Sequence, residues 1–166
     1  RKTSRLVFFL LPAYSASEKL SWLIAQAPLR LSTHEGIIGG LVQTFLSIRG
    51  INFLFPGDME RAGFLNLLKY QPFVNLLPNV HVLMAAHHGR ENGKCEAMFD
   101  LYGCNPELVV ISDCAKKHQS QETVPYYYSK ARGIAGFRGK GPRSVLTTRS
   151  DGHIWFRWEN GACKVF

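Results

Sequence analysis

The sequence lacks paired cysteines and an apolar run of membrane length. Its four cysteines are scattered without a C-x-x-C pair, which argues against a zinc ribbon and favours a reduced, cytoplasmic protein. The opening RKTSRLVFFLLPAYSAS has the basic, apolar and small-residue order of a signal peptide, but its apolar run is far shorter than the roughly 20 residues of a membrane span. We therefore predict a buried strand over Leu6–Leu11 and no membrane partner.

An initiator methionine, an internal repeat and a dividing linker are also missing. The chain opens on Arg1, which suggests that it begins inside a larger gene product. Its 166 residues suit one domain with a substantial core, and 46% hydrophobic against 19% charged residues is typical of a globular chain. We expect a single domain over residues 1–166.

Acidic residues are scarce relative to basic ones. Twelve Asp and Glu face 20 Lys and Arg, which gives a net charge of +8. The imbalance is steeper from residue 130 onward, and such a tail either attracts a polyanion such as nucleic acid or forms a solvated basic face. The acidic residues of this tail are Asp151 and Glu159. Its basic residues are Lys130, Arg132, Arg138, Lys140, Arg143, Arg149, Arg157 and Lys164.

Local patterns predict alternating strands and helices. Two β-rich runs, Leu41–Ile48 and Ile51–Phe55, are joined by Arg49-Gly50, which is typical of a tight hairpin because glycine accepts a positive φ. Apolar residues at helical spacing predict a helix over Glu60–Tyr70. The other expected elements are a strand over Val80–Ala86, a helix over Lys94–Tyr102, a strand over Glu107–Ser112, a helix from Thr123 to Gly133, a mobile loop over Gly133–Arg143, and a β-meander of strands Ser144–Thr148, Ile154–Trp158 and Cys163–Phe166.

Three of the predicted strands end in a loop that begins with a metal-binding or acid–base residue. Asp58 follows INFLF-Pro-Gly, and Asp113 follows ELVVIS. The doublet His87-His88 follows VHVLMAA. Functional groups gather outside the carboxyl ends of strands in open α/β architectures, and strands about 4.8 Å apart allow them to converge. The alternative is a structural role, since Asp is also common in turns and helix caps.

These residue types suit metal-dependent hydrolysis. A bridging carboxylate such as Asp58 can hold two divalent ions about 3.5–4 Å apart, which generates hydroxide at neutral pH and clamps both oxygens of a displacement. Neutral imidazole is a good zinc ligand when its second nitrogen has an orienting partner. Gly89 lets the backbone approach a substrate, and Arg90 suits pairing with a phosphate.

The segments FLFPGDME, VLMAAHHGREN and PELVVISD, in this order and spacing, resemble the metallo-β-lactamase fold, and within it the ComEC-type competence proteins and their stand-alone relatives. The resemblance covers about Leu41–Trp158, and SVLTTRSDGHIWFRW is similar to the end of those domains. It implies an α/β fold (α+β in some schemes): an αββα sandwich with one or two metal ions at the sheet edge, here incomplete at the N-terminus.

The resemblance also implies roles for individual residues. Asp58 corresponds to the aspartate that bridges two metal ions, and one histidine of the doublet corresponds to a metal ligand. We favour His88 as the ligand and His87 as the contact to the scissile phosphate or ester, while the reverse assignment stays open. Two zinc ions are expected, with manganese as the alternative.

The chain departs from the family at one hallmark. The motif HxHxDH, which supplies most of the ligands upstream of the Gly-Asp turn, is absent. His34 is the only histidine before Asp58, and its surroundings, THEG, do not form that motif. Either the missing part lies upstream or in a companion chain, or the protein is a degenerate member without metal. We favour the first explanation.

Several other residues are assigned with open alternatives. Lys117 and His118 are candidates for substrate binding beside Arg90, with a solvated loop as the alternative for His118. Tyr126, Tyr127 and Tyr128 either stack on bases or pack in the core, and we favour the core for at least one. We expect His34 in a loop before the hairpin, with the role of an intermediate histidine ligand of the family as the alternative. We expect His81 on a sheet face and His153 at the surface.

The function expected from these features is metal-dependent hydrolysis. Phosphodiesters of DNA or RNA are the leading substrates, and a role in anti-phage defence or DNA processing follows from the resemblance alone. One alternative is a degenerate module that binds nucleic acid or a partner protein without turnover. A further alternative is a hydrolase of small esters or lactones, because a fold does not fix a function.

Overall fold

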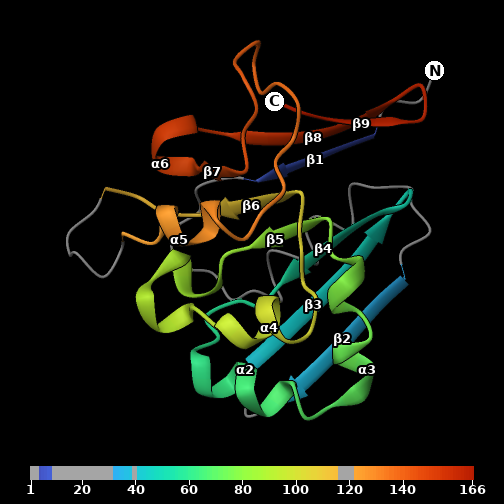
Figure 1. Ribbon diagram of the computed structural model, residues 1–166. Coiled ribbons are helices and arrows are strands. Elements are labelled where there is room, and N and C mark those ends of the chain that lie inside the picture. Colours follow the sequence, from blue (N-terminus) through green and yellow to red (C-terminus); the bar gives the residue numbers. More distant parts are fainter. Residues whose placement is uncertain (1–3, 9–31, 39–40, 116–121) are drawn as a thin grey trace.

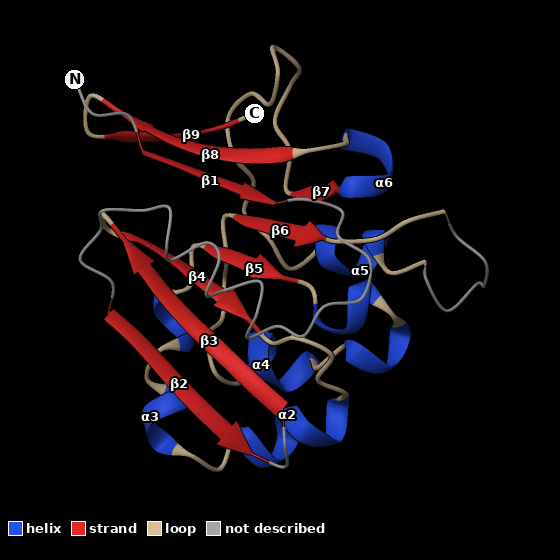
Figure 2. Cartoon of the chain, turned by 180° about the vertical axis from the view of Figure 1, so that it is seen from behind, coloured by secondary structure: helices blue, strands red, loops and turns tan. Residues whose placement is uncertain are grey.

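The computed structural model describes residues 4–8, 32–38, 41–115 and 122–166. The chain forms two β-sheets that face each other, with helices against the outer face of the larger one (Figures 1 and 2). The larger sheet has the order β2 (Ser32–Ile38), β3 (Leu41–Ile48), β4 (Ile51–Phe55), β5 (Val82–Met84), β6 (Leu108–Ile111) and β7 (Val145–Thr147). The smaller sheet has the order β1 (Ser4–Phe8), β8 (Ile154–Glu159) and β9 (Ala162–Val165).

Helical segments connect the strands of the larger sheet. Those between β4 and β5 are α2 (Arg61–Leu67), α3 (Gln71–Val74) and the 3-10 turn η1 (Leu77–Asn79). Those between β5 and β6 are the 3-10 turns η2 (Ala86–Gly89) and η3 (Glu91–Gly93), followed by α4 (Glu96–Asp100). The helix α5 (Val124–Tyr128) precedes β7, and α6 (Thr148–Asp151) follows it. No helix among the described residues is both long and apolar enough to cross a membrane.

The predicted β3–β4 hairpin is confirmed. Ile48 pairs with Ile51, and the two turn residues between them have φ angles of +48° (Arg49) and +84° (Gly50). Two consecutive positive φ angles are the geometry that two-residue hairpins prefer, since their twist matches that of the flanking strands.

The strands β4, β5, β6 and β7 run parallel to one another. Parallel neighbours require crossover connections, which the helical segments supply. As a result, the carboxyl ends of four strands lie along one edge of the larger sheet, which we call the carboxyl edge.

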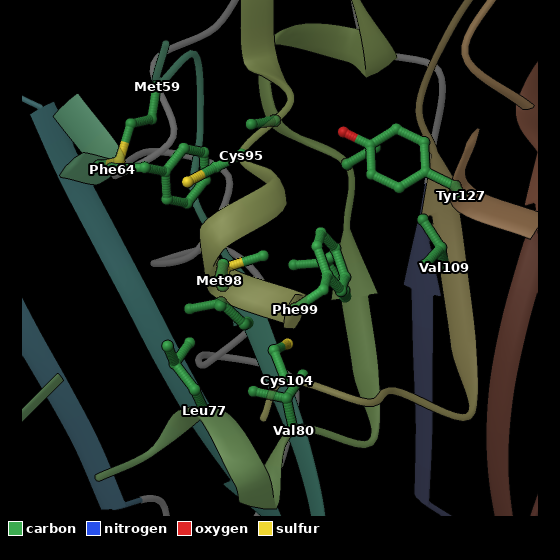
Figure 3. Close-up of a cluster of buried hydrophobic side chains, with 14 of the residues drawn as sticks. Met59, Phe64, Leu77, Val80, Cys95, Met98, Phe99, Cys104, Val109 and Tyr127 are labelled. Carbon is green, nitrogen blue, oxygen red and sulfur yellow. The ribbon is translucent and has the colours of Figure 1, made fainter. Parts of the chain in front are cut away.

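Two apolar clusters hold these layers together. The first lies between the two sheets, where Phe53 of β4 meets Phe156 of β8 edge to face with ring centroids 5.0 Å apart. The second lies between the larger sheet and the helices (Figure 3). Figure 3 shows Met59, Phe64, Met98 and Phe99 among its members.

The predicted β-meander is wrong in its first strand. β7 joins β6 in the larger sheet, whereas β8 forms a hairpin with β9 in the smaller sheet. Burial explains the difference: every residue of Val145–Thr147 is buried, while exposure alternates along Ile154–Glu159. A parallel strand between covered faces lacks the alternation that a half-exposed antiparallel strand shows.

The segment predicted to be a mobile loop, Gly133–Arg143, is anchored instead. Ile134 pairs with Arg143, and Phe137 pairs with Lys140. The Phe137 side chain is 2% exposed within the inter-sheet cluster. One buried ring therefore fixes a segment whose glycine content indicated mobility.

The boundaries of several other predicted elements shift. The helices predicted over Lys94–Tyr102 and Thr123–Gly133 are the shorter α4 and α5. The strand predicted over Leu6–Leu11 corresponds to Ser4–Phe8, and residues 9–11 lie outside the described part. The α/β class is confirmed, whereas the second helical layer of an αββα sandwich is not found within the described ranges.

Candidate functional site

The carboxyl edge brings together three of the segments that the sequence singled out. Asp58 lies in the turn after β4, and His87 and His88 lie in η2 after β5. The backbone N–H of His87 donates to the carbonyl oxygen of Gly57 over 2.9 Å, which ties these two segments together. Ser112 and Asp113 follow β6 at the same edge.

Asp58 and His88 form the central pair of the candidate site. The His88 Nε2 lies 3.5 Å from the Asp58 Oδ1, and their side chains are 48% and 65% exposed. The other ring nitrogen of His88, Nδ1, lies 2.8 Å from the carbonyl oxygen of Ser112. Since a carbonyl only accepts, Nδ1 donates to Ser112, which leaves Nε2 as the ring nitrogen that faces Asp58.

The backbone of the doublet is in an unusual conformation. His87, His88 and Gly89 have φ angles of +49°, +56° and +70° in succession. Each non-glycine residue in the left-handed region costs roughly 1–2 kcal/mol. Such strain persists only where the surroundings impose it, and it is frequent at functional sites.

Two glycines next to the doublet are required by packing. A Cβ on Gly89 would lie 2.6 Å from Cγ2 of Ile111, and one on Gly93 would lie 2.5 Å from the carbonyl oxygen of Ala86. The Thr123 hydroxyl donates to the Gly89 carbonyl oxygen. The doublet is thus held between β6 and the start of α5, and Ile111 occupies the side of Gly89 on which a Cβ would lie.

The second histidine, His87, has a different set of partners. Its Nδ1 lies 3.6 Å from Oε1 of Glu60, and its Nε2 lies 3.3 Å from Nη1 of Arg90. The Asn92 side-chain amide donates to the same Glu60 oxygen over 2.7 Å. His87 is only 19% exposed, so its ring is better enclosed than that of His88.

Asp113 reaches the carboxyl edge but serves a structural ion pair. Its side chain is 5% exposed, and Oδ2 lies 2.6 Å from Nη1 of Arg149. The Asp113 Oδ1 also accepts the backbone N–H of Arg149 over 3.2 Å. Sequence reasoning missed Arg149, which follows the buried stretch SVLTT just as Asp113 follows ELVVIS; the three hydroxyl residues of SVLTT obscure this likeness in the sequence.

The Asp58–His88 pair fits two ligands of one divalent cation. With zinc–ligand bonds of about 2.0–2.1 Å, two ligands of a tetrahedral site lie about 3.3 Å apart, close to the observed 3.5 Å. The Ser112 carbonyl supplies the partner that ligating imidazoles usually have on their second nitrogen. Within the part of the chain described, however, no group of three or more His, Cys, Asp or Glu could hold a metal ion.

A hollow of about 370 Å³ lies between α5, β7 and α6. Arg149 and Arg143 line it, and Arg149 links it to Asp113 at the end of the neighbouring strand. Both arginines are held by carboxylates, since Arg143 Nη2 lies 3.0 Å from each oxygen of Asp151. With Glu122 also in its lining, the hollow has mixed rather than purely positive charge.

The basic tail is largely engaged in internal ion pairs. Arg138 donates to the backbone carbonyl oxygens of Asp151 and His153. Pairing lowers the positive charge that the tail presents to a polyanion, because each contact to a phosphate competes with a carboxylate. The pairs are Lys130–Asp100, Arg132–Glu107, Arg143–Asp151, Arg149–Asp113, Arg157–Glu159 and Lys164–Glu159.

Burial lowers the reactivity of three of the four cysteines. All four are free thiols, and Cys114 is the exposed one. Burial raises the pKa of Cys104 to about 12 and that of Cys163 to about 11, and it also raises the pKa of Cys95. Thiols with raised pKa values stay protonated at neutral pH and are poor nucleophiles.

The structure describes only some of the remaining predicted residues. Lys117 and His118 lie outside the described residues. His34 lies within β2 rather than in a loop, and His81 accepts the backbone N–H of Asn52 on its Nδ1 over 3.1 Å. Tyr127 is buried as expected for one tyrosine of the run, Tyr126 is partly buried, and Tyr128 and His153 are exposed.

Comparison with known proteins adds no assignment: no family model matches the chain, and neither curated proteins nor solved structures match it significantly. The resemblance of FLFPGDME and VLMAAHHGREN to the metallo-β-lactamase fold therefore stays a prediction.

Proposed function

We propose that this protein is a metal-dependent hydrolase that cleaves phosphodiesters of DNA or RNA, with the metallo-β-lactamase fold of the ComEC type. The observation that carries the proposal is the Asp58–His88 pair, which is brought together from two strand ends with the ring proton of His88 committed to Ser112. A bound zinc or manganese ion, or a pair of them, would supply an activated water and neutralise charge on the phosphate.

In this proposal the described residues divide into two groups. Asp58 and His88 hold the metal, and the remaining ligands come from residues other than those described. His87 and Arg90 face the substrate, where a guanidinium can pair with phosphate oxygens. Their mutual distance of 3.3 Å places a base and a cation side by side at the same edge.

The free thiols are consistent with a cytoplasmic location, because disulfides are rare in reducing compartments. We keep this location, and any role in anti-phage defence or DNA processing, as part of the same proposal.

Metal content and nuclease activity test the proposal together. We expect zinc or manganese at stoichiometric level in the purified protein, and cleavage of single- or double-stranded DNA or RNA that a chelator abolishes. The enzyme assignment would be overturned if the folded protein contains no bound metal although both zinc and manganese were present in the growth medium.

The informative variant at the pair is His88→Asn. Asparagine tolerates the left-handed conformation of residue 88 and its amide can still donate to Ser112, so the change removes Nε2 while it preserves the backbone. We expect loss of at least one metal equivalent and about a 100-fold fall in kcat. The control is His153→Asn, an exposed histidine outside the carboxyl edge. Equal cleavage by the two variants would remove His88 from the site.

One observation favours a second candidate, a degenerate module that binds nucleic acid or a partner protein without turnover. The described residues offer two metal ligands rather than three, and a divalent ion held by two protein side chains binds weakly. Binding without cleavage, with no effect of metal on the affinity, would support this candidate over the hydrolase.

A further inference from the structure

Glu60 is a residue that the sequence did not single out, although it stands two positions after Asp58 in GDME. It lies immediately before α2, and its side chain is 57% exposed. Its carboxylate reaches back toward the doublet, so that Oε1 faces Nδ1 of His87 at 3.6 Å and accepts the side-chain amide of Asn92 at 2.7 Å. The two acid–imidazole pairs, Asp58 with His88 and Glu60 with His87, therefore lie side by side.

The hydrogen-bond partners of His87 define one tautomer. Arg90 can only donate, so the Nε2 that it contacts is the acceptor and Nδ1 carries the proton. This Nδ1 is buried, and within the described part of the chain no hydrogen-bond partner satisfies it at normal length. The negative charge of the Glu60 carboxylate, 3.6 Å away, favours the ring orientation in which the buried Nδ1–H points toward it.

Asn92 fixes the carboxylate in turn. Glu60 precedes α2, whereas Asn92 lies in η3 beyond the doublet, so their hydrogen bond joins two segments 32 residues apart. The exposed Glu60 side chain would otherwise sample several rotamers. The amide of Asn92 therefore restricts Glu60 to the rotamer that faces His87.

We propose that Glu60 is a positioning residue, which orients His87 with Nδ1–H toward its carboxylate and Nε2 toward the substrate beside Arg90. This inference rests on the proposed function for the role of His87 toward substrate. The orientation itself does not depend on catalysis, because it follows from the contacts of Glu60, Asn92 and Arg90.

The orientation is tested by two-dimensional NMR of the protein labelled with ¹⁵N-histidine, at a pH at which imidazoles are neutral. The His87 signals are assigned by their loss in His87→Asn. We expect the Nδ1–H tautomer in the wild type. In Glu60→Ala we expect a mixture of both tautomers, because the remaining contact from Arg90 to Nε2 is long, at 3.3 Å, and comes from an exposed side chain that cannot hold one tautomer alone. Glu60→Gln should recover most of the Nδ1–H form, because its amide oxygen still accepts. An Nε2–H tautomer in the wild type would overturn the proposal, as would an unmixed Nδ1–H form in Glu60→Ala.

A matched control separates positioning from a general loss of charge. Glu91 lies in η3 with a 59% exposed side chain, but it pairs with Lys94 at 2.5 Å. Glu91→Ala is expected to leave the His87 tautomer unchanged. If it mixes the tautomers as much as Glu60→Ala does, the proposal fails.

Turnover distinguishes this inference from the proposed function. If the protein cleaves phosphodiesters, Glu60→Ala should lower kcat about 10-fold with KM and bound metal unchanged, and Glu60→Gln should restore most of that loss. A change in KM alone would assign Glu60 to binding and overturn positioning. If the wild type shows no turnover at all, the proposed function fails while the tautomer result still decides the orientation.

Discussion

At the scale of single residues, three consecutive left-handed residues set the direction of both imidazoles. The extended alternative at His87 and His88 would send successive side chains to opposite faces, as in a strand. With φ angles of +49° and +56°, His88 meets Asp58 and His87 meets Glu60 instead. The chain sustains this conformation because Gly89 follows, packed against Ile111.

Gly89→Ala tests this account of the turn. The new Cβ would lie 2.6 Å from Ile111 at a φ of +70°, and we expect the free energy of unfolding to fall by about 2–4 kcal/mol from overpacking and backbone strain together. The measurement is the midpoint of urea unfolding.

The control for Gly89→Ala is Gly50→Ala in the β3–β4 turn. Gly50 has a similar φ of +84°, but a Cβ there would meet nothing within 4 Å. It should cost only the strain, roughly 1–2 kcal/mol, at the lower end of the loss expected for Gly89→Ala. Equal losses in the two variants would show that Ile111 moves aside without cost.

At the scale of secondary-structure elements, patterns were informative where short stretches of sequence determine the outcome. The β3–β4 hairpin was predicted because Arg49-Gly50 encodes its turn, and the end of β6 was predicted from the apolar run ELVVIS. The placement of β7 was not, since three buried residues pair with whichever neighbour the crossover through α5 provides. Such pairing depends on distant residues and leaves no periodic signal.

The ion pair between the end of β6 and α6 is the contact that local sequence could not show. Asp113→Ala removes the partner of Arg149, whose side chain is only 21% exposed, and leaves a poorly solvated cation. We expect a loss of about 3 kcal/mol in the free energy of unfolding, measured by chemical denaturation.

Glu107→Ala is the matched control, because Glu107 pairs with Arg132 and both side chains are exposed, at 44% and 52%. An exposed pair contributes less than about 1 kcal/mol. Should the two variants lose the same stability, the Asp113–Arg149 contact would have no special structural role.

At the scale of the whole molecule, the parallel order of β4 to β7 explains why residues from three segments meet. Sequence reasoning reached Asp58, His87 and His88 because parallel strands present their carboxyl ends at one edge. It also placed Asp113 at this edge but did not predict its ion pair with Arg149. It did not single out Glu60, because the position of Glu60 before a predicted helix gives no sign of a contact with His87. The positive charge of the tail can be counted in the sequence. The ion pairs with Asp100, Glu107 and Asp113 could not be predicted, because these carboxylates belong to other elements.

The arrangement of these ion pairs leads to a prediction for nucleic-acid binding. Six of the eight basic residues after position 129 are paired with carboxylates, and Arg138, although exposed, is bound to backbone carbonyls. Lys140 of the 134–143 hairpin is exposed, and its side chain forms no ion pair with another described residue. We therefore expect the protein to contact about three phosphates of a single-stranded oligonucleotide, through Arg90, Lys140 and one opened pair. At about 0.7 counterions per phosphate, the logarithm of the affinity should fall with the logarithm of salt concentration with a slope near −2.

Fluorescence anisotropy of a labelled oligonucleotide between low and moderate salt measures this slope, with Lys140→Ala expected to make it shallower by about 0.7. A slope near −6 would mean that all the basic residues of the tail leave their carboxylates and contact phosphates. In that case the internal ion pairs would not limit binding, and the prediction would be wrong. A protein that neutralises phosphates must release counterions, whatever nucleic-acid sequence it binds. A flat response would therefore mean that no phosphate is contacted, and the assignment of nucleic acid as the partner would be wrong.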